Sequence, residues 1–174
     1  MTELEPLETV NLDGYGNPPL TWSRARDGLA AGTPGTLATC FLGTCGPGGR
    51  PHAAGIGALW FDGALYFVSG PGTRKSRDLA SNPACTLSIR LPGIDLVCEG
   101  EAVRVTDLPT LQDAAARYRA GGWPAEVEGA AFVAPYSAPS AGPPPWHLYR
   151  VNLRSIVGTA TAEPSGATRW GFRR

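Results

Sequence analysis

A glycine-containing turn in the middle of the chain is followed at once by three cations. The segment reads Ser69-Gly70-Pro71-Gly72-Thr73-Arg74-Lys75-Ser76-Arg77. Cations at a helix start are unfavourable, because the helix macrodipole is positive at that end. A bound anion would reverse the sign of that penalty, and free N–H groups, hydroxyls and cations together can hold a phosphate. The segment therefore favours a phosphate site over a solvated basic turn without a ligand. Its expected ligands are Ser69, Thr73, Arg74 and Lys75.

The elements around this segment predict a mainly β fold. Apolar and β-branched runs bounded by turn residues indicate strands over 36–42, 51–60, 64–69, 84–91 and 94–105, and two or three more within 146–172. Capping residues and glycines indicate helices over 21–31, 74–81 and 106–120. Short connections join antiparallel neighbours, so the order predicts a six- to seven-stranded antiparallel barrel with peripheral helices.

Two segments stand outside this pattern. Residues 1–20 contain several prolines and glycines and are predicted to form an extended N-terminal arm before a single domain over 21–174. Residues 123–145 are rich in Pro, Ala, Gly and Ser. A loop of this length without secondary structure is uncommon in a compact domain and usually has a function or forms an interface.

The composition bears on partners and location. The 174 residues suit one domain, and 15 basic against 15 acidic residues leave no formal charge. A neutral chain argues against nucleic acid or an anionic membrane as the main partner. No apolar run is long enough to span a bilayer, and the acidic N-terminus does not resemble a secretory signal. We therefore expect a cytoplasmic protein.

The cysteines and histidines do not predict a metal site. None of the four cysteines forms a close C-x-x-C pair, and the two histidines, His52 and His147, lie far apart in the sequence. Three of the cysteines fall within strand-like apolar runs, where a free thiol behaves as a small hydrophobic group. These are Cys40, Cys85 and Cys98.

Several ordered runs resemble the pyridoxamine 5′-phosphate oxidase-like superfamily of FMN-binding split barrels, and within it the actinobacterial flavin and deazaflavin oxidoreductases. The matching runs are Gly49–His52, Gly57–Phe67, Gly72–Leu79, Asn82-Pro83 and the C-terminal Gly166–Phe172. Together they cover most of the chain, and their order is more specific than the basic turn alone.

The resemblance implies a split barrel that forms a homodimer, with two cofactor sites at the dimer interface. The residues that match the phosphate-binding positions are Ser69, Thr73, Arg74 and Lys75, with Arg77 close by. A strand of small residues would run beside the cofactor ring, since glycine lets a flat ligand approach the backbone, although a bulge or barrel bend is an alternative role for each glycine. The residues implied there are Ala54, Gly55, Ile56, Gly57 and Ala58.

Some positions depart from the oxidases that give the superfamily its name. Those enzymes hold their substrate with an arginine and a histidine in the C-terminal motif, and the matching residues here are Ser165 and Ala167. Arg169 keeps the second arginine of that motif, and Asp95 replaces a glutamine that contacts the flavin. The resemblance therefore implies an oxidoreductase of this fold that is not a vitamin B6 enzyme.

In such enzymes the cofactor carries the hydride, and the protein binds, orients and shields it. The chain shows no Ser-His-Asp set and no G-x-S-x-G elbow, so the sequence gives no catalytic residue of its own. Quinones, biliverdin-like tetrapyrroles and unsaturated small molecules are all compatible substrates. The candidate substrate-pocket residues are Trp60, Asp95, Tyr136, Trp146 and Arg169, and for the aromatic ones core packing is an equal alternative.

The cofactor is either FMN or the deazaflavin F420, because both carry a phosphate on a ribityl chain. The polyglutamate tail of F420 would favour extra cations, which Arg50 and Arg77 could supply. The sequence is also compatible with two functions other than that of an enzyme. One is a flavin-binding carrier or redox sensor without turnover, and the other is an empty barrel that uses residues 123–145 as a contact surface.

Overall fold

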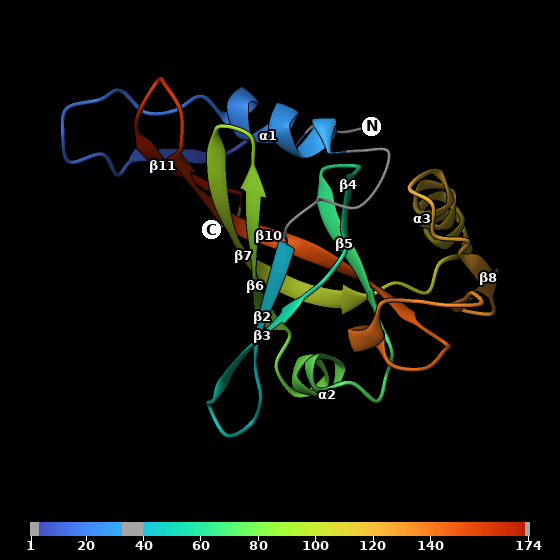
Figure 1. The fold of residues 1–174 in the computed structure, drawn as a ribbon. Coiled ribbons are helices and arrows are strands. Elements are labelled where there is room, and N and C mark those ends of the chain that lie inside the picture. The colour runs from blue at the N-terminus through green and yellow to red at the C-terminus, as the bar shows by residue number, and fades with distance from the viewer. Residues whose placement is uncertain (1–3, 33–39, 173–174) are drawn as a thin grey trace.

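The computed structural model describes residues 4–32 and 40–172, and a curved antiparallel sheet dominates them (Figure 1). Its strands are β1 (Glu8–Asn11), β2 (Cys40–Cys45), β3 (Pro51–Gly55), β4 (Ala58–Phe61), β5 (Ala64–Ser69), β6 (Ala84–Leu91), β7 (Ile94–Arg104), β10 (His147–Ala160) and β11 (Ala167–Gly171). The helices are α1 (Trp22–Ala31), α2 (Arg74–Ser81) and α3 (Leu108–Ala120). Between α3 and β10 lie β8 (Glu126–Glu128), β9 (Ala131–Val133) and the 3-10 turn η1 (Pro139–Ala141).

The main sheet is open. Within the described ranges, neighbouring strands follow the order β1-β11-β10-β7-β6-β2-β3, while β5 pairs with β10 and with β4. The 14-residue strand β10 is the junction: its first part pairs with β5, its last part with β11, and most of its length with β7, with a register shift between Leu153 and Ser155. All of these pairs are antiparallel. The expected class, a split antiparallel barrel with peripheral helices, is confirmed.

The main sheet has nine strands across residues 4–32 and 40–172, against the six or seven expected. One extra strand, β1, comes from the N-terminal arm, where it pairs with β11. The other arises because the strand expected over 51–60 is broken at Ile56, whose N–H donates to Cys40 O at 3.0 Å. Before this point the chain pairs with β2, and after it the chain pairs with β5. Residues 33–39, which include the start of the strand expected over 36–42, lie outside the described residues.

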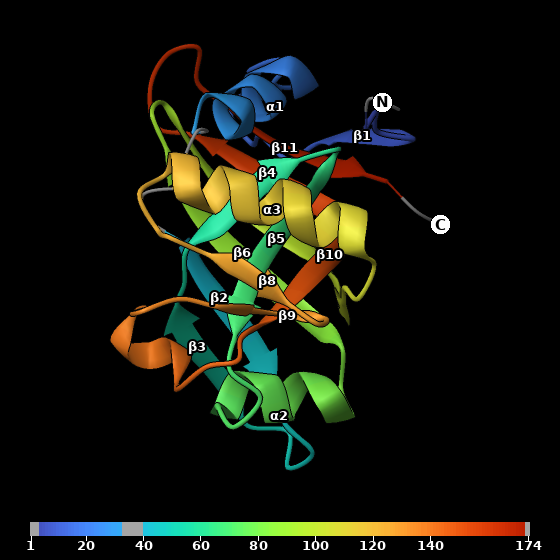
Figure 2. The same cartoon turned by 90° about the vertical axis from the view of Figure 1, so that its right-hand side faces the viewer.

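The helices form where the capping residues indicate. The Thr73 and Asp107 side chains accept hydrogen bonds from the N–H groups of Ser76 and Thr110 and so cap α2 and α3. Thr21 is the N-cap residue of α1, but its side chain makes no capping hydrogen bond. Helices α1 and α2 lie at opposite ends of the barrel, and α3 lies along its side (Figure 2). The helices therefore leave one broad face of the sheet uncovered.

The buried side chains form two clusters on either side of β4 and β5. One fills the barrel interior and includes Trp22, Phe67 and Trp170. The other lies between these strands and α3 and includes Leu111, Tyr118 and the segment after α3. That segment, 123–145, was expected to lack secondary structure, but it contains the β8–β9 pair and η1, and Phe132 forms a bridge with Trp146. Its aromatic residues have enough apolar surface to pack a second core.

The cysteines are free thiols, and three are buried as expected. Burial raises the pKa of Cys40 and of Cys85 to about 12, and it raises the pKa of Cys98 as well. These thiols are therefore protonated and unreactive at neutral pH.

Candidate functional site

A network of hydroxyl groups fixes the turn between β5 and α2. Ser69 Oγ lies 2.8 Å from Thr73 Oγ1 and accepts a hydrogen bond from Ser76 Oγ at 2.8 Å. Thr73 Oγ1 also contacts Gly70 O at 2.9 Å, and Ser69 is fully buried. Because these hydroxyls already bond to one another, Ser69 and Thr73 shape the turn. Either hydroxyl would have to give up a partner to bind a phosphate.

Lys75, the only lysine of the sequence, is buried at the start of α2 with 4% of its surface exposed. Its Nζ donates a 2.8 Å hydrogen bond to Ser140 O, and no carboxylate among the described residues forms an ion pair with it. Desolvation lowers the pKa of this amine, because burial disfavours its charged form. A buried ammonium with one neutral partner is a cation that an anionic ligand would stabilise.

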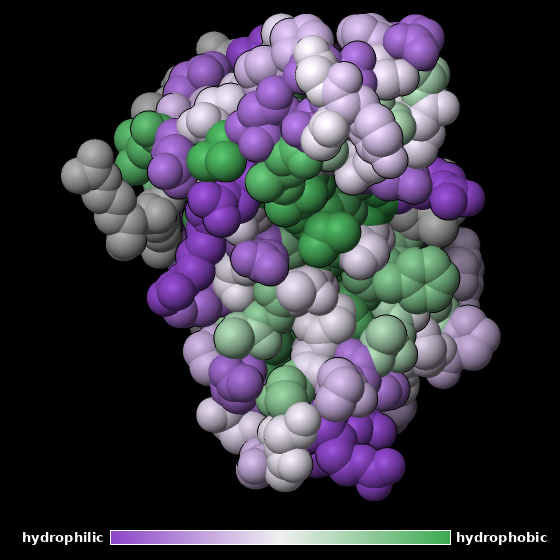
Figure 3. Space-filling model, turned by 90° about the vertical axis from the view of Figure 1, so that its left-hand side faces the viewer, coloured by the Kyte–Doolittle hydropathy of each residue, from purple (hydrophilic) through white to green (hydrophobic). Residues whose placement is uncertain are grey.

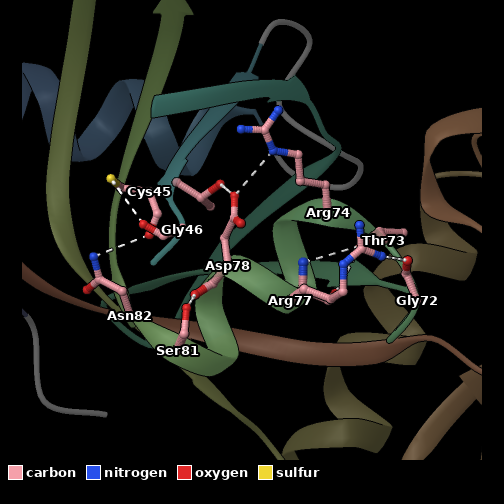
Figure 4. A network of polar contacts seen from close by, with 11 residues as sticks. Cys45, Gly46, Gly72, Thr73, Arg74, Arg77, Asp78, Ser81 and Asn82 are labelled. Atoms are coloured by element: carbon pink, nitrogen blue, oxygen red, sulfur yellow. Dashed lines mark hydrogen bonds and ion pairs between the residues drawn. The ribbon is translucent and has the colours of Figure 1, made fainter. Parts of the chain in front are cut away.

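The two arginines of the segment contact groups close to them in the chain (Figure 4). Arg74 is half exposed and lies 3.8 Å from the carboxylate of Asp78, which also accepts a 2.9 Å hydrogen bond from Thr44. Arg77 is exposed and donates to Gly72 O in the preceding turn. Of the three cations, only Lys75 faces the cavity described next.

A cavity of about 520 Å³ opens beside Lys75. One wall is the link between β3 and β4, where the small residues expected beside a flat ligand lie. The other walls come from β5, α3 and the segment after α3. The lining residues are Gly55, Ile56, Gly57, Val68, Lys75, Tyr118, Trp123, Tyr136, Ser137, Ala138, Ser140 and Ala141. The fold thus brings two predicted parts of the cofactor site together, 55–57 and Lys75.

Gly70 holds the η1 turn against this cavity. Its N–H donates to Ala141 O at 2.8 Å, and a Cβ on Gly70 would lie 2.6 Å from that same oxygen. Such a contact is too short for any side chain, so the backbone needs glycine at this position. The close approach places the neighbouring Ser140 carbonyl over the Lys75 amine.

Comparison with known proteins assigns the family. The family model of pyridoxamine 5′-phosphate oxidase matches residues 35–162. The chain belongs to the pyridoxamine 5′-phosphate oxidase family. No curated protein sequence matches the chain.

Solved structures share the fold at low identity. A pyridoxamine 5′-phosphate oxidase-related, FMN-binding protein from Nostoc punctiforme is 19% identical, with a TM-score of 0.54 and coverage of 85% of this chain and 89% of its own. PhzG from Burkholderia lata is 17% identical, with a TM-score of 0.54 and coverage of 95% and 92%. A putative 5-nitroimidazole antibiotic resistance protein from Bacteroides thetaiotaomicron is 15% identical, with a TM-score of 0.57 and coverage of 94% and 89%. At these identities the likeness shows the fold alone.

Several residues implied by the family resemblance lie outside the cavity. Ala54 pairs with Leu42 in the sheet, and Ala58 is fully buried in the barrel core. Trp60 is also a core residue, and Trp146 is buried with its Nε1 donating to Gly142 O at 2.9 Å. For both tryptophans the structure shows the core-packing role.

Of the five substrate-pocket candidates, only Tyr136 lines the cavity. Asp95 stands at the β6–β7 hairpin, 3.3 Å from Arg90, and Arg169 stands on β11, 3.7 Å from Glu8. Both are on the main sheet and do not line the cavity.

Sequence reasoning missed Tyr118 and Trp123 as cavity residues. Tyr118 completes an i, i+3, i+4, i+7 series with Leu111, Ala114 and Ala115, which is the pattern of an ordinary buried helix face. Trp123 lies in the Pro-rich segment, and the unusual length of that segment was the available signal. No local pattern distinguishes an aromatic residue at the edge of a core from one that also lines a cavity.

The described residues show neither a metal site nor a membrane-spanning helix. Across 4–32 and 40–172, no group of three or more His, Cys, Asp or Glu side chains is arranged to hold a metal ion. No helix within those same ranges is both long and apolar enough to cross a membrane.

Proposed function

We propose that this chain is an FMN- or F420-dependent oxidoreductase that transfers hydride between the bound cofactor and a small organic substrate. We further propose that it is not a true pyridoxamine phosphate oxidase. The observation that carries the proposal is the buried Lys75 in a cavity that the glycine-containing link 55–57 also lines. A cation and a flat backbone wall within one cavity suit a ligand with a phosphate at one end and a planar ring at the other.

The cavity fits such a cofactor in size and chemistry. Its volume of about 520 Å³ lies in the usual range of about 300–1,000 Å³ for small-molecule sites. Lys75 would hold the phosphate, and Gly55 and Gly57 would let the ring approach the backbone. When bound, the flavin or deazaflavin supplies the hydride chemistry. The residues of this chain bind it, orient it and exclude water.

The solved structures support this proposal. The Nostoc punctiforme protein binds FMN, and PhzG was solved in complex with tetrahydrophenazine-1-carboxylic acid. Both share the fold of this chain. Either cofactor would offer a phosphate to Lys75. The carboxylates of the F420 polyglutamate tail would pair with exposed cations. Arg50 in the β2–β3 turn and Arg77 on α2 are both exposed.

We propose in addition that two copies of the chain pair through the uncovered face of the sheet. Phe41, Ser88, Val97 and Val157 are direct cross-strand neighbours and therefore share that face. Phe41 and Val97 are 50% and 41% exposed, and Figure 3 shows apolar side chains gathered in the middle of this side of the molecule. Glu101 and Arg154 on the same strands form an ion pair at 2.9 Å, which adds opposite charges beside the apolar row.

Light scattering of the wild type should give the mass of a dimer, and light scattering of Val97→Glu should give the mass of a monomer. A monomeric wild type would contradict the pairing.

The first test of the function is a fluorescence titration of the wild type and of Lys75→Ala with FMN and, separately, with F420. We expect tight binding of one cofactor, weakened tenfold or more by Lys75→Ala, which is about 1.4 kcal/mol. Arg117→Ala is the matched charge control, since the Arg117 guanidinium lies 4.5 Å from the Phe61 ring centroid and does not line the cavity. Its affinity should equal that of the wild type.

Two outcomes would contradict the proposal. If neither cofactor binds, the site is not a flavin site. If one binds tightly but the reduced cofactor is not oxidised by any quinone or other unsaturated acceptor, the chain is a carrier or sensor instead of an enzyme.

A further inference from the structure

Tyr118 is a closely packed residue of the cavity lining. It projects from the buried face of α3, with 3% of its surface exposed. The Trp123 ring packs edge-on against it with centroids 5.1 Å apart, and Phe132 does the same at 6.1 Å. With contacts from two aromatic neighbours, the phenol ring has little freedom to turn away from the cavity that it lines.

The hydroxyl of Tyr118 has no hydrogen-bond partner in the part of the chain that the structure describes. Among residues 4–32 and 40–172, it is the one buried side-chain nitrogen or oxygen in that state. Buried polar atoms in folded proteins are almost always paired, because an unpaired one loses its bonds to water without replacement. Burial raises the pKa of Tyr118, so the hydroxyl keeps its proton at neutral pH and can donate a hydrogen bond.

The other aromatic residues around the cavity have already used their polar atoms. Trp123 Nε1 donates to Tyr136 O at 2.6 Å, and Tyr136 OH donates to Gly122 O at 3.3 Å. Both rings therefore offer only apolar surface, as Ile56 and Val68 do. Of the described residues in the lining, Lys75 alone is charged, and its amine contacts Ser140 O. The aromatic end of the cavity thus presents flat apolar walls, and one residue of its lining, Tyr118, carries an unpaired hydroxyl that is itself enclosed.

We propose that Tyr118 Oη donates a hydrogen bond to a carbonyl or nitro oxygen at the edge of a planar conjugated ring bound against Trp123 and Tyr136. This inference rests on the proposed function, because it assigns the ring that lies in the cavity whose cation is Lys75. The ring is either that of the cofactor, whose dione edge carries such oxygens, or that of a substrate such as a quinone or a nitroarene. An apolar ring without an acceptor leaves the hydroxyl unpaired and binds less well.

The test compares Tyr118→Phe with the wild type. Tyr66→Phe is the matched control, because Tyr66 is equally buried and stacks on Phe61 at 4.0 Å, but does not line this cavity. The cofactor-ring probes are FMN and lumiflavin, which has the flavin ring without the ribityl phosphate. The substrate-ring probes, added to cofactor-loaded protein, are menadione and 2-methylnaphthalene, which has the same ring system without carbonyl groups.

We expect Tyr118→Phe to weaken binding of an acceptor-bearing ring about five- to tenfold, with Tyr66→Phe unchanged. If FMN and lumiflavin are the affected probes, the cofactor ring carries the acceptor. If menadione alone is affected, the acceptor belongs to the substrate, and 2-methylnaphthalene should bind equally to both proteins. If all affinities stay within twofold, the hydroxyl serves no ring and the inference is overturned.

The result that would overturn the Tyr118 inference differs from the result that would overturn the proposed function. Loss of FMN binding in Lys75→Ala with no effect of Tyr118→Phe on any probe overturns the inference and leaves the proposed function standing. A wild type that binds neither FMN nor F420 overturns the proposed function. In that case lumiflavin still decides the inference, since it carries no phosphate and its binding depends on the aromatic end and not on Lys75.

Discussion

The two ends of the cavity satisfy their polar groups in opposite ways. At the α2 end, the hydroxyls of Ser69, Thr73 and Ser76 bond to one another, and Lys75 bonds to a backbone carbonyl. At the aromatic end, the Tyr118 hydroxyl has no partner among the described residues. A ligand at the first end must replace existing bonds, whereas a ligand at the second end adds one. The polar groups at the α2 end are therefore ordered before any ligand binds, whereas the inference for the aromatic end is that its hydroxyl gains a hydrogen bond only when a ligand binds.

The largest expected effect comes from removing the close contact that organises the α2 end. Gly70→Ala would place a methyl group 2.6 Å from Ala141 O, and the η1 turn would have to move away from Lys75. We expect a loss of about 1–3 kcal/mol in the free energy of unfolding, measured by chemical denaturation, together with weaker cofactor binding. Gly72→Ala is the control, because its Cβ would meet nothing within 4 Å. Equal stabilities of the two variants would show that the contact does not order this end.

Deleting one hydroxyl at each end of the cavity should change the free energy of unfolding by different amounts. Ser69→Ala removes a partner from Thr73 and Ser76 and should cost about 1–2 kcal/mol of unfolding free energy, because the buried Ser76 hydroxyl loses the acceptor of its hydrogen bond. Tyr118→Phe removes a hydroxyl that has no partner, so the ligand-free protein should be unchanged or slightly more stable. Thermal unfolding of both variants without ligand checks this. A Tyr118→Phe variant as destabilised as Ser69→Ala would erase the difference between the ends.

The smallest effect concerns pH at the α2 end. The pKa of Lys75 is lowered by desolvation from 10.5, so between its folded value and 10.5 the folded state binds fewer protons than the unfolded state. The contribution of Lys75 to the free energy of unfolding therefore rises with pH between these two pKa values. Phosphate binding should change in the opposite direction, because the neutral amine lacks the charge that attracts the anion.

We expect FMN or F420 affinity to fall about fivefold as pH rises through this window, measured by fluorescence titration. The Lys75→Arg variant keeps its positive charge throughout this pH window, so its affinity for the cofactor should not change with pH. A wild type with pH-independent affinity would show that the Lys75 charge does not contact the ligand.

The sequence predicted the elements that depend on local signals. The Thr73 cap, the helix over 74–81 and the turn at Pro92-Gly93 all follow from residues within a few positions of one another. It also indicated that Lys75 and the link 55–57 would meet, through the family resemblance. The break at Ile56 was not predictable, because it depends on the chain leaving β2 to pair with β5, two strands brought together only by the fold.

The cavity residues were harder to predict than the fold. Trp60 and Trp146 pack in cores while Tyr136 lines the cavity, and nothing in the chemistry of an aromatic side chain separates these cases. Tyr118 resembles a core residue until its hydroxyl is found without a partner. The Ser140 contact to Lys75 could not be predicted either, because it uses a backbone carbonyl that any residue would supply.

That last contact has a consequence for how the site tolerates sequence change. Because Ser140 reaches Lys75 through its main chain, the identity of residue 140 is nearly free, whereas the length of the chain from β9 to β10 is not. Substitutions across 138–140 should be widely accepted in a mutational scan, while a one-residue deletion there would displace the carbonyl. The position of this carbonyl oxygen therefore depends on the length of the segment and not on the identity of its residues. Comparisons of related chains that score only substitutions would underrate its importance.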